Sequence, residues 1–189
     1  AEWKGAMPVA GLGTSMGSWI RATPALDGKR LYVAGMPDLL VCLDPKTGSE
    51  RWRADFHARY GTLLPELGFV SSPLVVKDGV FVQTADSFVK VDKKTGKKVW
   101  LTERPFKTVG ENGDTYSSPF VTTIDGVETI VTWGGDHLTG HDAGTGKQIW
   151  FCGGFNPNTQ RVWRTIASPV GTDGVAVVVY GREEFVAGI

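Results

Sequence analysis

One phrase, Asp-x-x-Thr-Gly-x-x-x-Trp, occurs three times in this chain, and it constrains the fold more than any other feature. Its copies are "DPKTGSERW" at 44–52, "DKKTGKKVW" at 92–100 and "DAGTGKQIW" at 142–150. The tryptophans that end them are 48 and 50 residues apart, and Trp3 lies 49 residues before the first. A constant period of about 20 to 50 residues is typical of propellers, solenoids and other repeat proteins.

Two further markers share this period. A small residue followed by proline recurs at 23–24, 72–73, 118–119 and 168–169, and an Asp-Gly pair follows each one. Within the unit that starts at Ser72, the segments "PLVV", "VFVQT", "FVKVD" and "KVWLT" are separated by turn residues. Four short antiparallel strands per repeat are typical of a β-propeller blade, so we predict an all-β partial propeller of about four four-stranded antiparallel blades. A complete small barrel or sandwich built from the same strands is the alternative.

The repeated residues have a structural explanation. A tryptophan at a fixed place on an outer strand gives a flat apolar surface to the next blade, and its N–H can reach a backbone acceptor. The aspartate can accept hydrogen bonds from turn amides, and the glycine permits a left-handed backbone. We therefore expect docking between blades, and not catalysis, from Trp3, Trp52, Trp100, Trp150, Gly48, Gly96, Gly146, Asp44, Asp92 and Asp142.

The three phrases resemble the pyrroloquinoline-quinone-like propeller repeat, whose tryptophan-docking motif reads Ala-x-Asp-x-x-x-Gly-x-x-x-Trp. Asp, Gly and Trp are present in all three copies, whereas Cys42, Lys90 and Gly140 replace the alanine. The family includes quinoprotein dehydrogenases, the propeller lipoprotein of the outer-membrane β-barrel assembly machinery and uncharacterised extracytoplasmic proteins, and the last two are the most similar. The resemblance implies an extracytoplasmic location, periplasmic or secreted.

Such propellers close with about six to eight blades, so the resemblance also implies that the chain is a fragment of a longer ring. We expect residues 1–20 to be the end of a preceding blade and a link, blades at 21–54, 71–103 and 117–152, and an incomplete blade at 167–189. An arc of blades leaves a strand edge at each end, and such edges favour self-association.

The charge balance, the length of the apolar runs and the cysteine content bear on which binding partners and sites the chain can have. Lys plus Arg and Asp plus Glu number 20 each, which gives no support for a nucleic-acid partner. No apolar run approaches the about 18 residues that a membrane-spanning helix needs. The two cysteines, Cys42 and Cys152, lie in different repeats, so we expect free thiols and neither a disulfide framework nor a thiolate metal site.

Three long links between the blades, 53–70, 101–117 and 151–167, are the candidate recognition elements, because the turns on the opposite face are minimal. Arg, Tyr and Trp around a channel mouth suit a planar or acidic group on a protein or carbohydrate partner. The alternative is that the aromatic residues pack the loops down and the charges are paired or solvated. The candidate binding residues are Tyr60, Arg104, Tyr116, His137, Arg161, Trp163, Arg164 and Arg182.

Three patterns suggest an ion or phosphate site but lack the spacing. His137 and His141 are four residues apart on a predicted strand, about 13 Å, too far to share one ion. His141 occupies a repeat position that is apolar in the other copies, so we expect it to pack in the interior. "GENGD" at 110–114 lacks the spacing of an EF-hand loop. No helix is predicted after the glycine-rich "GLGTSMG" at 11–17, so we predict neither a phosphate site nor a metal site.

The sequence favours a non-catalytic binding or scaffold module that works through the long-loop face. It assigns no catalytic residue and makes no cofactor evident. The alternative is part of a pyrroloquinoline-quinone-dependent dehydrogenase, which by the resemblance would hold the quinone, a calcium ion, an aspartate base and commonly a vicinal cysteine pair. Cys42 and Cys152 are 110 residues apart, so that pair is absent from this sequence. No feature supports a hydrolase or a lyase.

Overall fold

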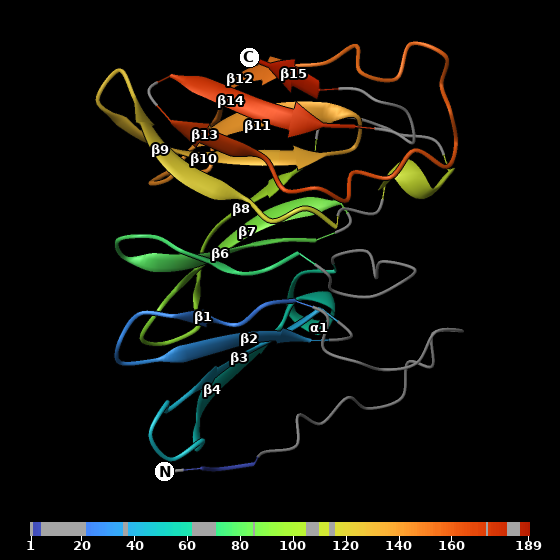
Figure 1. Ribbon diagram of the computed structural model, residues 1–189. Coiled ribbons are helices and arrows are strands. Elements are labelled where there is room, and N and C mark those ends of the chain that lie inside the picture. The colour runs from blue at the N-terminus through green and yellow to red at the C-terminus, as the bar shows by residue number, and fades with distance from the viewer. Residues whose placement is uncertain are drawn as a thin grey trace.

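The computed structural model describes residues 2–4, 22–35, 38–61, 71–84, 86–104, 110–113, 116–172, 174–180 and 186–189. Their strands form four separate antiparallel sheets, each made of strands that are consecutive in the chain. The sheets stack one on the next along the molecule (Figure 1). The predicted all-β propeller architecture is confirmed, and the alternative of a small barrel or sandwich is not formed by the described strands.

Three sheets have four strands and one has three. Sheet 1 contains β1 (Ala25–Leu26), β2 (Leu31–Gly35), β3 (Leu39–Leu43) and β4 (Glu50–Asp55). Sheet 2 contains β5 (Leu74–Val75), β6 (Gly79–Gln83), β7 (Ser87–Asp92) and β8 (Lys98–Glu103). Sheet 3 contains β9 (Phe120–Ile124), β10 (Val127–Gly134), β11 (His137–Asp142) and β12 (Gln148–Cys152). Sheet 4 contains β13 (Val170–Thr172), β14 (Val175–Val179) and β15 (Val186–Gly188).

Two short helices lie in the links, and the sequence analysis did not predict them. The helix α1 (Phe56–Tyr60) begins after Asp55, whose side chain accepts a hydrogen bond from Ala58 N at 2.7 Å. It ends at Gly61, which has the left-handed φ of 69°. The 3-10 helix η1 (Gly110–Gly113) occupies the second link. Both are too short to produce a helical period of apolar residues in the sequence.

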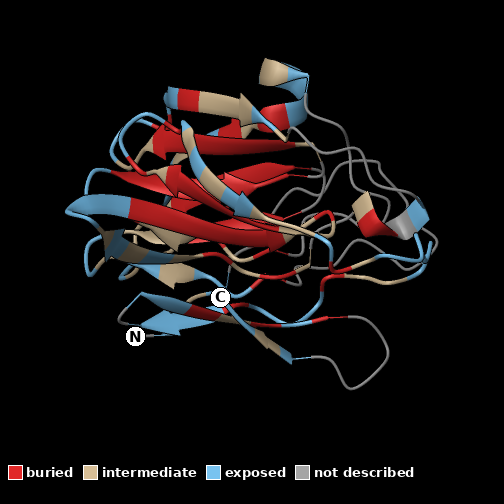
Figure 2. Cartoon of the chain, turned by 90° about the horizontal axis from the view of Figure 1, so that it is seen from above, coloured by how far each residue is buried: buried red, intermediate tan, exposed pale blue. Residues whose placement is uncertain are grey.

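Each pair of neighbouring sheets encloses its own apolar cluster. Leu40 and Ala34 of sheet 1 belong to the same cluster as Val82 and Val89 of sheet 2. Two further clusters join sheets 2 and 3 and sheets 3 and 4. Buried residues fill the middle strands, whereas exposed residues lie at the turns (Figure 2). The stability of the molecule therefore depends on contacts between neighbours in the stack, as in other repeat proteins.

The Asp-x-x-Thr-Gly segment forms the same tight turn at the end of β3, β7 and β11. At the second copy, the Asp92 carboxylate accepts hydrogen bonds from the backbone N–H of Lys94 at 3.0 Å and of Thr95 at 2.8 Å. Gly96 has a φ of 67°, and its N–H donates to Asp92 O at 2.9 Å. The hydroxyl of Thr95 adds a bond at 2.7 Å and is the main cause of the lowered pKa of Asp92. These contacts explain why Asp, Thr and Gly recur together.

Three indoles pack on the glycine of the next turn. A Cβ added to Gly96 would lie 2.6 Å from Trp52 Cε3, and one added to Gly146 would lie 2.5 Å from Trp100 Cε3. A Cβ added to Gly48 would overlap the ring of Trp3 in the same way. The indole N–H groups donate to the carbonyl that follows each repeat aspartate, at 3.1 Å for Pro45, 3.3 Å for Lys93 and 3.2 Å for Ala143.

A second donor reaches the same carbonyl at two of these junctions. Between sheets 1 and 2, the Tyr32 hydroxyl shares its proton between the Asp27 carboxylate at 2.9 Å and Lys93 O at 3.3 Å. Between sheets 2 and 3, Lys90 Nζ lies 2.6 Å from Ala143 O and 2.7 Å from Asp78 Oδ1. Asp27 opens the turn before β2, whereas Asp78 is the last residue of the turn before β6. Tyr32 and Lys90 nevertheless make equivalent junction contacts with different chemistry.

We expect Lys90→Met to reduce the free energy of unfolding by only about 1 kcal/mol, although Lys90 is 1% exposed. Ala143 O keeps its hydrogen bond from Trp100, and water can solvate the exposed Asp78 carboxylate. Lys90 is the main cause of the lowered pKa of Asp78, so this pKa should return toward its ordinary value. Side-chain NMR titration measures it, with Lys97→Met as the matched control. An unchanged pKa of Asp78 in Lys90→Met would refute the assigned ion pair.

Candidate binding site on the long-loop face

In sheets 1 and 2, the turn that joins the second and third strands lies beside the start of the long link that follows the sheet. Phe56 N donates to Asp38 O at 2.9 Å, and Arg104 N donates to Asp86 O at 2.7 Å. Asp38 and Asp136 both have a left-handed backbone, with φ of 49° and 64°. Because these turns and the links share one face of the stack, this face is the one on which the sequence analysis placed recognition.

Among the described residues, this face carries a polar cluster around Asp136, formed by Asn112, Asp136, Asn156 and Tyr180. The Asp136 carboxylate accepts a hydrogen bond from the Tyr180 hydroxyl, one from Asn156 Nδ2 at 3.0 Å, and two contacts from Asn112 Nδ2 at 3.2 Å. Both amide groups also donate to Gln160 O, at 2.7 Å from Asn112 and 3.0 Å from Asn156. The Asp136 cluster therefore joins η1, the third link, the turn before β11 and the end of β14.

An aromatic group supports the Asp136 cluster from within the molecule. Trp133 is fully buried and meets Phe155 and Tyr180 edge to face, with ring centroids 4.9 and 5.1 Å apart. Trp163 meets the other side of Tyr180 at 5.5 Å. Such edge-to-face pairs are favourable and fix the ring orientations. The third link is thus held by hydrogen bonds at Gln160 and by ring packing at Trp163.

This arrangement fixes the backbone path of the third link and leaves some of its side chains exposed to solvent. The Asp136 carboxylate is occupied by donors from its own chain, and these contacts hold the third link in place. Val162 and Ile166 are 44% and 63% exposed, and Arg161 is exposed beside them. An apolar and basic strip on a prearranged loop is suited to binding, because little conformational entropy remains to be lost.

The structure brings several of the predicted binding residues to this region. Trp163 packs against Tyr180, and Arg161 follows Gln160 directly in the third link. Tyr116 N donates to Thr165 O at 3.3 Å, which joins the second and third links. Arg104 donates to Gly113 O at 3.4 Å and to Thr84 O at 2.9 Å, with its guanidinium 5.3 Å from the centre of the Phe88 ring. Arg164 lies half-buried in the same link.

Other predicted residues lie elsewhere. Tyr60 packs beside the cluster between sheets 1 and 2 and stacks on Phe56 at 5.9 Å, with Lys98 Nζ 4.8 Å from its ring centre. His137 Nδ1 is hydrogen-bonded to Gly135 O at 2.6 Å. Arg182 lies outside the described residues. For Tyr60 and Trp163 these contacts agree with the alternative given in the sequence analysis, in which aromatic side chains pack against the protein and hold the loops in place. A binding role for each residue stays a prediction.

Sequence reasoning did not assign the Asp136 cluster a role, although a signal for it exists. Asp38, Asp86 and Asp136 recur at intervals of 48 and 50 residues, which is the repeat period itself. The partners of Asp136 could not be found in this way, because Asn112 and Asn156 come from links without a repeated pattern. Asn112 is fully buried, and its Oδ1 has no hydrogen-bond partner within the described part of the chain.

His141 is an interior residue, as its repeat position suggested. The side chain is fully buried, 3.0 Å from Thr139 Oγ1 through Nε2 and 3.3 Å from Gly146 O through Nδ1. Its ring lies 4.6 Å from that of Phe88. Burial lowers the pKa of His141, and the positive charge of Arg104 contributes in the same direction. The folded protein therefore holds this imidazole neutral at a pH where the unfolded chain would begin to protonate it.

We expect this histidine to make stability depend on pH near neutrality. Since the unfolded state binds the proton more readily, the contribution of His141 is complete above about pH 6.5 and is lost as the pH falls below that value. Urea unfolding at pH 8 and pH 5.5 measures the difference. His141→Leu, which follows the apolar side chains of Leu43 and Val91 at this position, should unfold with a smaller difference. An equal difference in both proteins would contradict the assignment.

No group of three or more His, Cys, Asp or Glu side chains gathers in the described ranges. Cys42 is buried in sheet 1 and Cys152 lies in sheet 3, and both are free thiols. No helix in the part of the chain that the structure describes has the length and apolar character to cross a membrane.

Comparison with solved structures supports the architecture. BamB from Moraxella catarrhalis matches with a TM-score of 0.64 and 18% identity over 90% of this chain and 46% of that one. Quinohemoprotein alcohol dehydrogenase from Comamonas testosteroni matches with a TM-score of 0.54 and 22% identity, over 71% of this chain and 21% of that one. The computationally designed protein Ika8 matches with a TM-score of 0.57 and 13% identity, over 87% and 44%. At these identities the likeness concerns the fold alone.

The chain spans less than half the length of each of these proteins. No match was found among curated protein sequences. The sequence profile of one family, described as outer membrane protein assembly factor BamB, matches residues 3–187. The match covers nearly the whole chain and agrees with the repeated Trp–Gly junctions of its sheets, so this chain belongs to the BamB family of pyrroloquinoline-quinone-like β-propeller repeats.

Proposed function

We propose that this chain is a non-catalytic extracytoplasmic binding module that recognises a protein partner through its long-loop face. The repeated Asp, Thr and Gly residues form turns on which Trp3, Trp52 and Trp100 pack, which leaves the links as the variable surface. The description of the matching family as an assembly factor supports a protein as the partner and a location outside the cytoplasm. Carbohydrate is the other partner class that a ring of Arg and aromatic residues suits.

The observation that carries this proposal is the anchored third link. The Asp136 cluster fixes Gln160, and the ring of Tyr180 packs against Trp163, so the segment between them is held at both ends. Val162 and the basic Arg161 between these anchors are exposed. Arg and aromatic residues dominate the binding energy of protein interfaces, and anchored loops bind at a lower entropic cost.

Quantitative affinity purification tests the proposal. The immobilised chain is incubated with the envelope fraction of its source, and bound proteins are measured by mass spectrometry. We expect one partner to be enriched and its recovery to fall at least about tenfold with the double variant Arg161→Ala/Arg164→Ala. The matched control is Lys94→Ala/Lys97→Ala, which removes two exposed charges from the Thr-Gly turn on the opposite face.

The possible results distinguish the binding face, the class of partner and the absence of binding. Equal recovery with the arginine variant and the lysine control would remove the long-loop face as the binding surface. Enrichment of no protein, together with binding on a glycan array that the arginine variant abolishes, would change the partner class to carbohydrate. Enrichment of no protein and no glycan would refute the binding role.

The second candidate is part of a quinone-dependent dehydrogenase, which the structural likeness to quinohemoprotein alcohol dehydrogenase favours. The described residues contain no group of three or more His, Cys, Asp or Glu side chains, and the sequence contains no vicinal cysteine pair. Titration with pyrroloquinoline quinone and calcium, followed by calorimetry, tests this candidate. A stoichiometric heat of binding would support it, and a flat titration would exclude it for this chain.

A further inference from the structure

Sheets 1 and 2 carry a local excess of positive charge, although the chain as a whole has no net charge. The segments 27–30, 77–78 and 90–98 together contain eight Lys or Arg residues and three aspartates. The corresponding segments of sheet 3, 125–128 and 142–148, contain one lysine and three acidic residues. The balanced total therefore conceals a basic region, and the local charge decides which partners are attracted to it.

The three basic segments lie beside one another at the junction of the two sheets. Lys93 Nζ donates to Lys77 O at 2.8 Å, which joins the two turns of sheet 2. The Tyr32 hydroxyl of sheet 1 contacts both Lys93 O and the carboxylate of Asp27, which joins the turn of sheet 1 to them. The lysines of these turns therefore form one surface. This basic turn surface consists of Lys29, Lys77, Lys93, Lys94 and Lys97.

The carboxylates of the same segments are engaged by groups of the fold. Asp27 accepts hydrogen bonds from two backbone N–H groups of its turn, at 3.0 and 2.8 Å. Asp92 does the same within its Thr-Gly turn, and Asp78 pairs with the buried Lys90 at 2.7 Å. Four lysines of the basic turn surface are exposed and form no ion pair with a described residue: Lys29, Lys77, Lys94 and Lys97. The turns therefore fix the negative groups and leave ammonium groups available to a partner.

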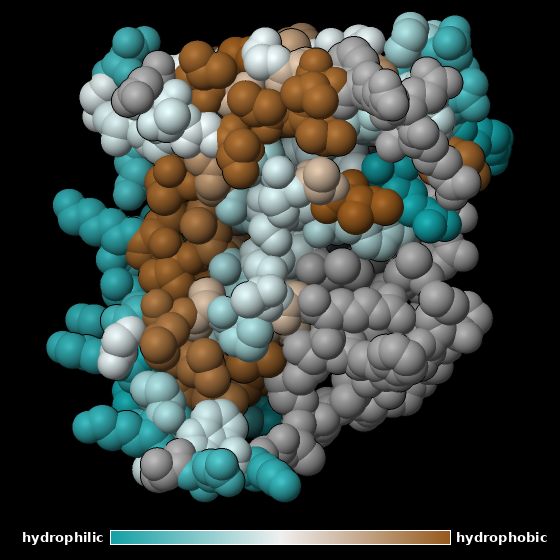
Figure 3. Space-filling model, in the orientation of Figure 1, coloured by the Kyte–Doolittle hydropathy of each residue, from teal (hydrophilic) through white to brown (hydrophobic). Residues whose placement is uncertain are grey.

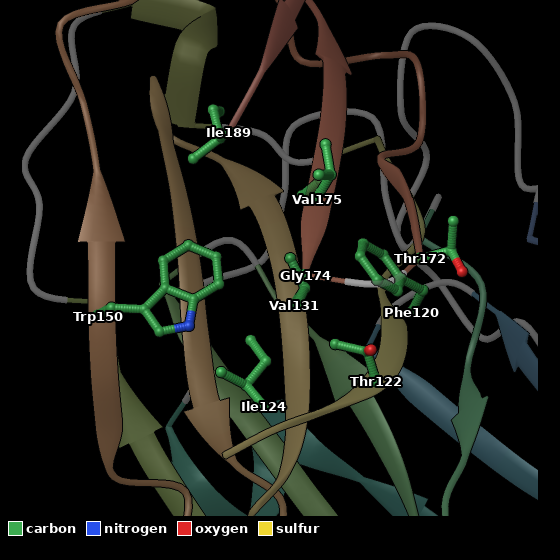
Figure 4. A pocket seen from close by; sticks show the side chains of 10 residues that line it. Phe120, Thr122, Ile124, Val131, Trp150, Thr172, Gly174, Val175 and Ile189 are labelled. Carbon is green, nitrogen blue, oxygen red and sulfur yellow. The ribbon is translucent and has the colours of Figure 1, made fainter.

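The charged and apolar parts of the molecular surface are separated. Long hydrophilic side chains project from the side of the stack that carries the turns, beside sheets 1 and 2 (Figure 3). The cavity of about 240 Å³ between sheets 3 and 4, in contrast, has no charged residue in its described lining (Figure 4). An anionic partner therefore finds complementary charge at the basic turn surface and none in this cavity.

We propose that the basic turn surface binds the phosphate groups of an anionic lipid membrane. A lysine ammonium is a compact point charge on a flexible stem, so it attracts a phosphate without a fixed geometry. Recognition of a carboxylate on a protein favours the planar guanidinium of arginine, and Arg30, the arginine of these segments, already lies 3.9 Å from Asp27. Basic clusters of about this size attract the anionic headgroups of a membrane. A surface of lysines therefore suits a layer of phosphates better than an acidic protein.

Binding through this surface would orient the chain. The acidic turns of sheet 3, with Asp125 and Glu128 exposed, are repelled by the same lipids, so sheets 1 and 2 face the membrane. The long links leave the opposite ends of the strands, so the long-loop face points away from the membrane and stays accessible (Figure 1). The basic turn surface and its ligand do not depend on the function of the long-loop face.

Co-sedimentation with lipid vesicles tests the proposal. Protein-free vesicles are prepared from phosphatidylcholine alone and from phosphatidylcholine with about 30% phosphatidylglycerol. We expect the chain to bind only the second kind at about 0.02 M salt and to be released at about 0.5 M salt, because salt screens exposed charges. Lys77→Glu/Lys94→Glu should reduce the partition coefficient at least about tenfold, whereas Lys77→Arg/Lys94→Arg should keep it.

The matched control is Arg59→Glu/Lys147→Glu, which makes the same change in net charge at exposed positions outside the basic turn surface. It should reduce binding clearly less, and circular dichroism verifies that each variant is folded. Equal losses with the two charge-reversed variants would overturn the proposal, because net charge alone would then explain them. So would binding to both kinds of vesicle, binding to neither, or release by inorganic phosphate at constant ionic strength. Because the vesicles contain no protein, these results are independent of the affinity purification that tests the long-loop face.

Discussion

Trp100→Ala is expected to lower the free energy of unfolding by about 3–5 kcal/mol, more than any other single substitution proposed for this chain. The indole is 8% exposed and lies in the cluster between sheets 2 and 3. Its removal leaves a cavity against Phe81, whose ring centre is 5.8 Å away, and takes one hydrogen bond from Ala143 O. Urea unfolding at equilibrium measures the change. Since whole domains are stabilised by about 5–15 kcal/mol, the variant should be close to unfolded.

Trp150→Ala provides the matched control, because it makes the same change at the same repeat position. Trp150 packs on Gly140 but has neither the turn glycine nor the carbonyl acceptor that Trp100 has in the described residues. We expect its substitution to cost clearly less than that of Trp100. If the two substitutions cost the same, the contact between an indole and the following turn would contribute nothing to the stability of the junctions.

Gly146→Ala should also destabilise strongly, by about 2–5 kcal/mol. Gly146 has a φ of 75°, where a side chain is strained, and the added Cβ would lie 2.5 Å from Trp100 Cε3. Gly126→Ala is the control: its φ is 79°, and a Cβ there would meet nothing within 4 Å. It should cost only the about 1–2 kcal/mol of the left-handed backbone.

The difference between these two glycine variants isolates the indole contact from the backbone strain. Thermal or urea unfolding of both variants gives this difference directly. We expect it to shrink in a Trp100→Ala background, because there the new methyl group has room. Equal destabilisation by the two glycine substitutions would mean that backbone strain alone explains the glycine in each Thr-Gly turn.

The sheets could be predicted because their signals are local and are repeated in phase. The Asp-x-x-Thr-Gly turn specifies its own hydrogen bonds, and its regular spacing from the Asp-Gly pairs locates the strands between them. Repetition also predicted the tryptophans as junction residues, and in the described residues Trp3, Trp52 and Trp100 pack on the glycine of the next turn, whereas Trp150 packs on Gly140 of its own sheet. His141 could be placed in the interior because the other copies have Leu43 and Val91 at that position.

The face with the links could be located from the sequence, but its contacts could not. Asn112 and Asn156 reach Asp136 from two segments that are distant in the chain and share no pattern. Tyr60 was predicted as a binding residue, yet its packing depends on a helix of five residues that no periodicity reveals. In the sequence, Lys90 only stands where the docking motif has alanine. Its role depends on Ala143 of the next sheet, whose carbonyl oxygen it contacts.

The indole junctions between sheets use the side of the stack that carries the Thr-Gly and Asp-Gly turns. Tyr32, Lys90 and the indoles anchor on carbonyls of that side, whereas the links leave from the other. Mutational drift, insertion or grafting in the parts of the links outside the Asp136 cluster can therefore proceed without disturbing the indole junctions. A scaffold divided in this way is free to acquire new specificities, and its tolerance to loop exchange should exceed that of folds whose loops also carry the core.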